Sequence, residues 1–584
     1  MAAVSDEYIR NVTPEYQQTS VRGHNHICRA TPLSYQQLLP FSACKESQPF
    51  MISNGLHSAA VDMEKHPEHG VSEETPRHED VSTAIETSSL KRDLSSRHIN
   101  MIAIAGMIGT GLFLSSGQAI ATAGPAGALL AYIVMGFVTA GVSYTTGEIT
   151  AFMPGTGGFI RHATKFVEPA LGAATGWNFW YTMAITVPAE ISAAATVIQF
   201  WNKTINPGVW ITVFLVVIVA LNLCGVRLYG ESEVVFASLK IMLILGLIIG
   251  GLVIDLGGGP NHDRLGFRYW NHPGAFNAYI KTGATGHFLA FWKVLLTAAF
   301  SYGNIQVVAI SGSETRNPRK IIPAGTKKTF YRVLFFYVLS IFIVGLIVPY
   351  NDTSLSISTG TAQQSPFVIA FQRSGVKVVP SIINAVVCTS AISSGSACIF
   401  IASRTLYGLS CDGHAPRFFQ RCNRFGSPYY AIGLTCLLLP LVYLNVANNT
   451  SVVFGWFVNI TTVSGLIGWV VIEATYLRFY AGLKSQGYSR DALPYKSPLQ
   501  PYVSWATMFV VSLVILFSGF DVFVKDNFTA AGFLTCYLNI AIFIAIYIFF
   551  KICFKSKVIP VKEIDFETEF LSIQREKDAA EVAF

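Results

Sequence analysis

The chain has 584 residues, of which 52% are hydrophobic and only 13% are charged, and its formal net charge is +7. A water-soluble domain carries about twice that charged fraction, so the composition excludes an ordinary soluble protein and indicates a polytopic membrane protein. The basic residues lie mostly in loops between apolar segments, so the positive charge does not indicate nucleic-acid binding.

Residues 1–92 are polar and rich in Ser, Thr, Glu, Gln and His, and they show no helical periodicity. We therefore predict a disordered cytoplasmic tail. Its histidines do not have the spacing of a zinc site. The ten cysteines of the chain include no C-x-x-C pair, so we predict neither a disulfide framework nor a metal site. No signal peptide is recognised, and the first apolar helix is expected to act as its own insertion signal.

Twelve apolar segments follow the tail, and most have about the 20 residues that a helix needs to cross a bilayer. Their predicted limits are 99–121, 126–152, 170–200, 208–225, 234–255, 286–312, 329–350, 376–403, 428–446, 452–479, 502–520 and 529–552. With the N-terminus in the cytoplasm, Lys and Arg are more frequent in the inside loops than in the outside loops, as the positive-inside rule requires. The predicted parts are the tail 1–92, a twelve-helix membrane domain 93–552 and a cytoplasmic C-terminal tail 553–584.

The first apolar segment, SRHINMIAIAGMIGTGLFLSSGQAIA (residues 96–121), contains three glycines in six residues, each of which weakens a helix by roughly 1 kcal/mol. Within a membrane, broken backbone is tolerated only inside protein or beside a cavity. The N–H groups at the start of a half-helix bind carboxylates. We therefore predict that this segment forms half of a substrate site. The residues assigned to this half are Gly106, Ile108, Gly109, Thr110 and Gly111.

The sixth segment and its exit read FLAFWKVLLTAAFSYGNIQVVAISGSETRNP, with the polar cluster Ser301-Tyr302-Gly303-Asn304 in the centre. Such a cluster interrupts a helix. Interruptions at corresponding positions of two halves indicate a transporter built from an inverted repeat. Glycines also serve close helix packing, but two polar interruptions five helices apart favour the transporter. We assign these four residues to the second half of the substrate site.

Several segments carry a resemblance to a known family. They are KRDLSSRHINMIAIAGMIGTGLFLSSG, GPAGALLAYIVMG, ALGAATGWNFWYTMAITVPAEISAAATVIQFW, SETRNPRKIIPAG and SRTLYGLS. They resemble the fungal amino-acid permeases (the yeast amino acid transporter family) of the amino acid–polyamine–organocation superfamily, over residues 90–555. The resemblance implies an all-α integral membrane protein with 12 transmembrane helices. These would form a 5+5 inverted repeat with discontinuous helices 1 and 6, plus two extra helices. It also implies secondary active import of amino acids, usually with protons.

Two interpretations remain open for Lys240, close to the inner end of the fifth segment. It is a lysine that reaches the cytoplasmic surface, or a proton-coupling ammonium, because related permeases have a lysine here in place of a sodium ion. The hydroxyls of the eighth segment, Ser393 and Ser394 among them, would then line the coupling site; otherwise they form ordinary helix–helix hydrogen bonds. Lys293 is predicted to reach the outer surface.

The carboxylates of the membrane segments are given structural or gating roles. Glu190, among small residues, is predicted to be the partner of a polar group on a neighbouring helix. Glu148 and Glu314, near the cytoplasmic edge, are predicted gate or packing residues. Glu473 is less expected from the family pattern, and pairs with Arg478 or with a cationic substrate; we favour Arg478.

The chain departs from the family pattern F-S-F-x-G-x-E-x-x-G in the sixth helix, where it has Asn304, Gln306 and Ala309. In the eighth helix, Ser396 replaces an expected asparagine. These positions lie where the side chain or amine of the substrate would be recognised, so the substrate need not be an ordinary α-amino acid. A branch of these permeases resembles transporters or sensors of carnitine or polyamines, and this chain is a candidate member of that branch.

The leading hypothesis is a plasma-membrane importer of amino acids, driven by proton symport with alternating access and with both termini in the cytoplasm. The alternative is a carnitine or polyamine transporter, or a ligand-sensing receptor with the permease fold. An enzyme is disfavoured, because the glycine spacing does not fit dinucleotide binding and no Walker A motif occurs. No cofactor, metal or nucleic acid is expected. The expected partners are an amino acid or related amine, protons and the lipid bilayer, with ubiquitin-ligase or trafficking partners as candidates on the tails.

Overall fold

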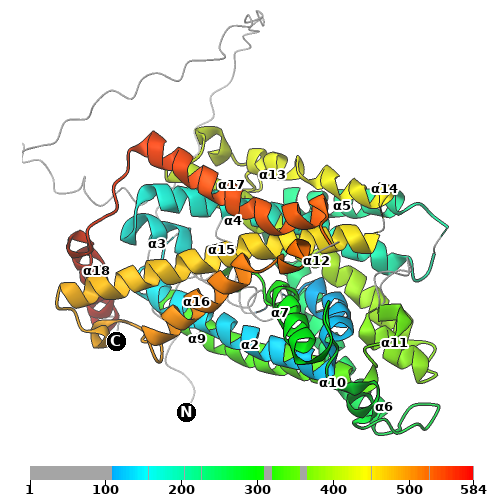
Figure 1. Ribbon diagram of the computed structural model, residues 1–584. Coiled ribbons are helices and arrows are strands. Elements are labelled where there is room, and N and C mark those ends of the chain that lie inside the picture. The colour runs from blue at the N-terminus through cyan, green and yellow to red at the C-terminus, as the bar shows by residue number, and fades with distance from the viewer. Residues whose placement is uncertain are drawn as a thin grey trace, which may run out of the picture. The chain divides into compact units, whose positions relative to one another are not determined.

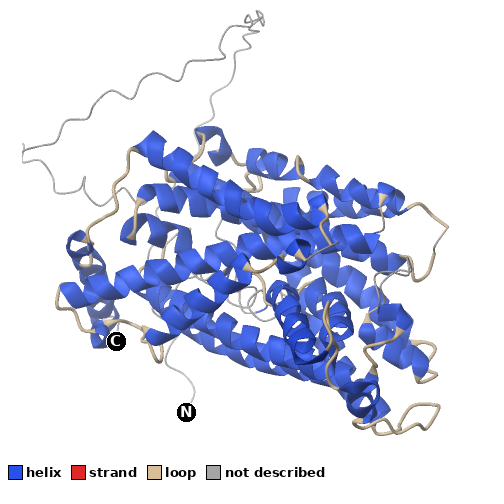
Figure 2. Ribbon diagram, viewed as in Figure 1, coloured by secondary structure: helices blue, strands red, loops and turns tan. Residues whose placement is uncertain are grey.

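The structure is a computed structural model that describes residues 101, 108–155, 157–202, 204–224, 226–307, 318–355, 365–448, 450–524 and 527–582. The predicted N-terminal tail, Gly106, Ala309 and Glu314 lie outside these residues. Within them, all regular secondary structure is helical (Figure 2). The fold class implied by the family resemblance, an all-α membrane protein, is confirmed at this level.

Six helices have 25 residues or more and form the frame of the molecule (Figure 1). They are α2 (Ser116–Phe152), α4 (Pro169–Ile198), α6 (Val226–Asp255), α12 (Val379–Cys411), α15 (Thr450–Ser485) and α17 (Ala530–Phe554). The shorter α-helices are α3 (Phe159–Phe166), α5 (Pro207–Leu223), α7 (Gly283–Ser301), α9 (Pro318–Arg332), α10 (Leu339–Ile347), α11 (Pro366–Arg373), α13 (Tyr429–Cys436), α14 (Leu444–Ala447), α16 (Tyr502–Leu516) and α18 (Glu567–Val582). Short π- and 3₁₀-segments join them, including η2 (Gly111–Ser115), η4 (Val333–Val338), η8 (Leu439–Tyr443), η9 (Arg490–Ala492), η10 (Phe520–Phe523) and η11 (Val561–Glu563).

Among the described residues, seven helices are long and apolar enough to cross a membrane. They are Gly111–Phe152, Pro169–Ile198, Leu228–Asp255, Val379–Cys411, Tyr429–Ala447, Thr450–Ser485 and Ala530–Phe554. Three shorter apolar helices, Pro207–Leu223, Phe335–Ile347 and Tyr502–Leu516, add to them. The protein is therefore a multi-pass membrane protein.

The predicted gap between the first two segments coincides with a kink at Gly124, where two helices meet within α2. Gly124 has φ 74° and ψ 172°, a conformation that favours glycine, and Pro125 follows it. The Ala126 N–H donates to the carbonyl of Ala275 at 2.9 Å, and a Cβ on Gly124 would lie 2.8 Å from that same oxygen. The chain thus leaves the helical conformation at Gly124, where a neighbouring loop approaches its backbone, and a second helix follows.

Helix α4 is the centre of the bundle, because it packs along both α12 and α15. Its Gly, Ala, Ser and Thr residues allow neighbouring helices to approach closely. Helix α2 packs against α7, α9 and α10, while α15 also contacts α2, α7, α16 and α17. The cavity described below lies where these two groups of helices meet.

The predicted C-terminal tail contains helix α18, which covers an aromatic cluster. Phe566, just before α18, is 1% exposed and packs against the rings of Phe152, Phe166 and Phe479. On α9, Arg319 holds the helix through Glu576 at 2.9 Å and Ser572 Oγ at 2.9 Å. The C-terminal segment is therefore part of the packed structure.

We expect Phe566→Ala to undock α18, because emptying an aromatic core site costs about 3–5 kcal/mol. Trypsin should then cleave the solubilised protein much faster at the exposed Arg575 and Lys577. Leu571→Ala is the matched control, since this residue of the same helix is 51% exposed. Equal cleavage rates for the two variants would show that Phe566 does not anchor the helix.

Candidate substrate site

The backbone of the first apolar segment is broken at Ile108 and Gly109, which are not helical, and the chain continues as the π-helix η2. A Cβ on Gly109 would lie 2.3 Å from Oε1 of Glu190, so any other residue would displace that carboxyl. The next residue, Thr110, donates its N–H to Glu190 Oε2 at 3.3 Å. The break expected from the glycines is thus present, and Glu190 of α4 lies directly against it.

The second break follows α7, which ends at Ser301, earlier than the predicted limit of 312. Residues 302–306 form turns, and Asn304 adopts a left-handed conformation with φ 66°. Asparagine tolerates this conformation better than most side chains. A Cβ on Gly111 would lie 2.8 Å from the Cα of Ser301, so the two broken segments touch each other.

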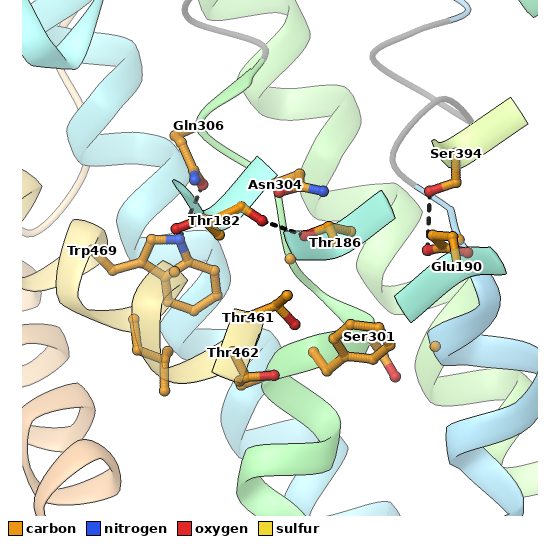
Figure 3. A pocket seen from close by; sticks show the side chains of 17 residues that line it. Thr182, Thr186, Glu190, Ser301, Asn304, Gln306, Ser394, Thr461, Thr462 and Trp469 are labelled. Carbon is orange, nitrogen blue, oxygen red and sulfur yellow. Dashed lines mark hydrogen bonds between the residues drawn. The ribbon is translucent and has the colours of Figure 1, made fainter. Parts of the chain in front are cut away.

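A cavity of about 50 Å³ lies between the two breaks, α4 and α15 (Figure 3). That space holds several waters. The lining residues are Gly109, Gly111, Thr182, Thr186, Glu190, Ala299, Phe300, Ser301, Gly303, Asn304, Gln306, Ser394, Thr461, Thr462, Gly465, Leu466 and Trp469. Glu190 is the one ionisable side chain among them, so the cavity is polar but carries little charge.

The structure brings five of the predicted substrate residues to this cavity. They are Gly109, Gly111, Ser301, Gly303 and Asn304. Ile108 and Thr110 are buried beside it, and Thr110 contributes its N–H to Glu190. Tyr302 is directed elsewhere: its hydroxyl donates to the Tyr132 carbonyl at 2.9 Å, and its ring packs on that of Tyr337. Ser394 lines the cavity and donates to Glu190 Oε1 at 3.0 Å.

Two rows of lining residues, one on α4 and one on α15, were not predicted as rows from the sequence; we call them the α4 stripe and the α15 stripe. Thr182, Thr186 and Glu190 follow one another at intervals of four residues on α4, so they share one helix face. Thr461, Gly465 and Trp469 repeat the interval on α15. This i, i+4, i+8 spacing was the available signal, although it does not tell which face of a helix meets a cavity.

Of the residues that depart from the family pattern, some line the cavity and others do not. Gln306 lines the cavity, and its Oε1 accepts a hydrogen bond from Trp469 Nε1 at 3.0 Å. A neutral amide therefore ties the second break to α15. Ser396 lies outside the lining, and its Oγ accepts from Asn222 Nδ2 of α5 at 3.0 Å.

Lys240 is buried in the bundle, with 1% of its surface exposed, so it does not reach the cytoplasmic surface. Its Nζ donates to Ser393 Oγ at 3.0 Å and lies 3.9 Å from Oε1 of Glu233. Ser393 in turn donates to Glu233 Oε2 at 2.8 Å. The neighbouring Ser394 bonds Glu190, so adjacent hydroxyls of α12 connect this charged pair with the first break. Glu233 was not predicted, because it precedes the predicted start of the fifth segment at 234.

Other ionisable residues have partners that were not predicted from the sequence. Lys293 pairs with Asp521 at 2.8 Å instead of reaching the outer surface alone. Glu148 accepts from Arg490 at 2.7 Å; burial alone would lower the pKa of Arg490, but the bond to Glu148 raises it. The pair of Glu473 with Arg478 is wrong, since Arg478 donates to the carbonyls of Phe166 and Ile559.

The sequence profile of the amino acid permease family matches residues 98–562. The chain belongs to this family. A proline-specific permease of Emericella nidulans is 43% identical to this permease over 490 residues, which cover 83% of the chain and 89% of the relative. Two permeases of Saccharomyces cerevisiae are also similar. The dicarboxylic amino acid permease is 40% identical and covers 83% of the chain, with 80% of the relative matched. The basic amino-acid permease is 38% identical, over 84% of the chain and 86% of the relative.

Among solved structures, the manganese transporter of Eremococcus coleocola superimposes on this permease with a TM-score of 0.51. The two share 12% sequence identity, and the match covers 78% of this chain and 94% of that chain. At this identity the likeness shows the fold alone. The resemblance stated from the sequence motifs is confirmed by the family match, and the protein is an amino acid transporter, not an enzyme.

Proposed function

We propose that this permease is a plasma-membrane secondary active transporter that imports a small neutral amino acid by proton symport with alternating access. The chain would cross the membrane twelve times, as two inverted five-helix repeats and two further helices, with both termini in the cytoplasm. The observation that carries this proposal is the meeting of two helix breaks at one polar cavity. Transporters of inverted-repeat architecture bind substrate at such breaks.

The lining favours a substrate without a charged side chain. A second substrate carboxylate would need a Lys or Arg, and no such residue lines the cavity in the described part of the chain. A cationic side chain or a polyamine would need several acidic groups, but Glu190 already accepts bonds from Thr110 and Ser394. Hydroxyl and amide groups remain, and these suit a small neutral amino acid. The Emericella relative is named proline-specific, so proline is the first substrate to test.

The bonds between Lys240, the two serines of α12 and Glu190 support proton coupling. While Glu190 is ionised, it holds the Thr110 N–H, which is one of the donors that a substrate carboxylate needs. A proton taken up by Glu190 would weaken this hold, because a hydrogen bond to a charged acceptor is about twice as strong as a neutral one. Proton binding would thus release a donor for the substrate.

Uptake by the purified protein in proteoliposomes tests the function. With an acidic exterior, we expect labelled proline or alanine to accumulate inside, and a protonophore to abolish the accumulation. Glutamate, lysine, carnitine and spermidine should compete poorly. Ligand binding without uptake would indicate a receptor, and accumulation of spermidine or carnitine would overturn the proposed substrate class.

We expect Asn304→Gly to broaden uptake toward large neutral amino acids such as leucine. Glycine keeps the left-handed backbone and removes the amide that occupies space in the cavity. Each additional substrate methylene in such a space changes binding by about 1–3 kcal/mol. Competition assays with a series of neutral amino acids measure the change. His262→Gly is the matched control, because His262 also has positive φ (50°) but is exposed in a loop. An unchanged ranking in Asn304→Gly would show that residue 304 does not face the substrate.

A further inference from the structure

Glu473 on α15 lies outside the substrate cavity and has no role in the proposed transport mechanism. It is 0% exposed, and neither of its carboxyl oxygens has a hydrogen-bond partner in the described part of the chain. Glu148, one helix away, is equally buried but accepts from Arg490 and from the Ser497 N–H. A buried carboxylate requires such partners. Glu473 lacks them, and its protonation state therefore needs an explanation.

The groups beside Glu473 are the hydroxyls of Thr145 on α2 and Ser504 on α16. These two form a closed ring with the Gln500 side chain. Gln500 Nε2 donates to Thr145 Oγ1 at 3.0 Å, and Ser504 Oγ donates to Gln500 Oε1 at 2.7 Å. Thr145 Oγ1 and Ser504 Oγ are 3.1 Å apart. In the closed arrangement the Ser504 hydrogen bonds to Gln500, and Thr145 then donates to Ser504.

The direction of the ring is fixed by the backbone. The Ser504 N–H donates to Gln500 Oε1 at 3.3 Å, so the oxygen of this amide faces α16 and its nitrogen faces Thr145. In this closed arrangement both hydroxyl hydrogens are used within the ring. The hydroxyl oxygens of Thr145 and Ser504 are then available to Glu473 only as hydrogen-bond acceptors.

An ionised carboxylate is also an acceptor and cannot bond to the hydroxyl oxygens of this closed ring, whereas a protonated carboxyl carries one O–H donor. The charged groups nearby are engaged with other partners. Arg490 binds Glu148, and Arg478 binds backbone carbonyls. Helix α16 contains no Asp, Glu, Lys or Arg, and the nearest titratable residue along α15 itself is Tyr476, three residues from Glu473.

We propose that Glu473 is a proton-binding site, in which the neutral carboxyl donates to the ring formed by Thr145, Gln500 and Ser504. Proton loss would require a ring hydroxyl to turn toward the carboxylate, and this breaks one link of the ring. Because the ring joins α2 to α16 against α15, which contact one another (Figure 1), the proton stabilises the contact of three helices. The site is separate from the Lys240 and Glu190 groups and does not depend on the transported substrate.

Infrared spectroscopy of the purified protein near neutral pH tests the proposal directly. The wild-type spectrum should contain a C=O band of one protonated carboxyl that shifts in D₂O and is lost in Glu473→Gln. Glu148→Gln is the matched control and should lose no such band, because Glu148 forms an ion pair with Arg490. Ser504→Ala frees the Thr145 hydrogen for Glu473, so the band should weaken at neutral pH. No band difference between wild type and Glu473→Gln would overturn the proposal.

Thermal unfolding at several pH values provides a second readout that is independent of transport. An unfolded glutamate releases its proton near pH 4.3, whereas the folded protein needs the neutral form. The midpoint of the wild type should therefore fall by several degrees, relative to Glu473→Gln, as the pH rises from 5 to 9. The two midpoints should come closest at about pH 4, below the pKa of the unfolded glutamate. Parallel curves for the wild type and Glu473→Gln would show that Glu473 does not hold a proton. If added NaCl stabilises the wild type but not the variant, Glu473 belongs to a sodium site instead of a proton site.

Discussion

Gly109→Ala should reduce amino-acid uptake by about 100-fold or more while the protein still reaches the plasma membrane. The new Cβ would lie 2.3 Å from Glu190 Oε1, so the carboxyl must move away from the break. It would then lose its bonds to the Thr110 N–H and the Ser394 hydroxyl, so that a proton on Glu190 could no longer control the Thr110 donor in the proposed cycle. Each bond to a charged group contributes about 1.5–3 kcal/mol, and about 1.4 kcal/mol corresponds to a factor of ten.

Labelled-proline uptake by whole cells, normalised to the amount of protein at the surface, measures this effect. Gly455→Ala is the matched control: this glycine lies in α15, and its added Cβ would meet no atom within 4 Å. It should transport at the wild-type rate. Wild-type uptake by Gly109→Ala as well would mean that Glu190 does not lie against the break during transport.

The two breaks could be predicted from sequence because their signal is local. Three glycines in six residues, and four polar or turn-forming residues inside an apolar run, are incompatible with a regular helix in hydrocarbon. The limits of the second break were less accurate. Its helix ends at Ser301, because Asn304 takes a left-handed conformation that hydropathy does not reveal.

The partners of the buried charges could not be predicted, since they depend on distant parts of the chain. Thr110 and Glu190 are 80 residues apart, and Ser394 and Glu190 are 204 residues apart. Nothing in the spacing of these residues shows that they meet. The pair of Glu233 and Lys240 is different: the two residues lie two turns apart on one helix. That signal was present, but the predicted segment began one residue too late to include Glu233.

The cavity lining likewise has features that the sequence shows and features that only the fold shows. The α4 stripe of Thr182, Thr186 and Glu190 and the α15 stripe ending at Trp469 are visible as i, i+4, i+8 repeats. Threonine, however, also bonds its own helix, as Thr186 does with the Thr182 carbonyl at 2.7 Å. A polar stripe in a membrane helix is therefore compatible with packing as well as with substrate recognition. Its meaning follows only from the position of α4 and α15 beside both breaks.

Replacing the buried ion pair of α6 by neutral groups should separate substrate movement from the proton gradient. Lys240→Met alone would leave the Glu233 carboxylate buried without its cation, which costs about 3–5 kcal/mol and risks misfolding. The double variant Lys240→Met/Glu233→Gln removes both charges and keeps the volume similar. We expect it to equilibrate labelled proline across a proteoliposome membrane but not to concentrate it when the exterior is made acidic.

The outer ion pair provides the matched control for this loss of coupling. Lys293→Met/Asp521→Asn also removes a lysine and its carboxylate partner, 2.8 Å apart in the wild type, but these residues do not line the cavity. This variant should still concentrate proline in response to the pH gradient and lose the accumulation when a protonophore is added. If the Lys240→Met/Glu233→Gln variant behaves in the same way, its charged pair only stabilises the contact of α6 with α12. The proton would then have to act through Glu190 alone, because Glu190 is the ionisable group that directly contacts the first break.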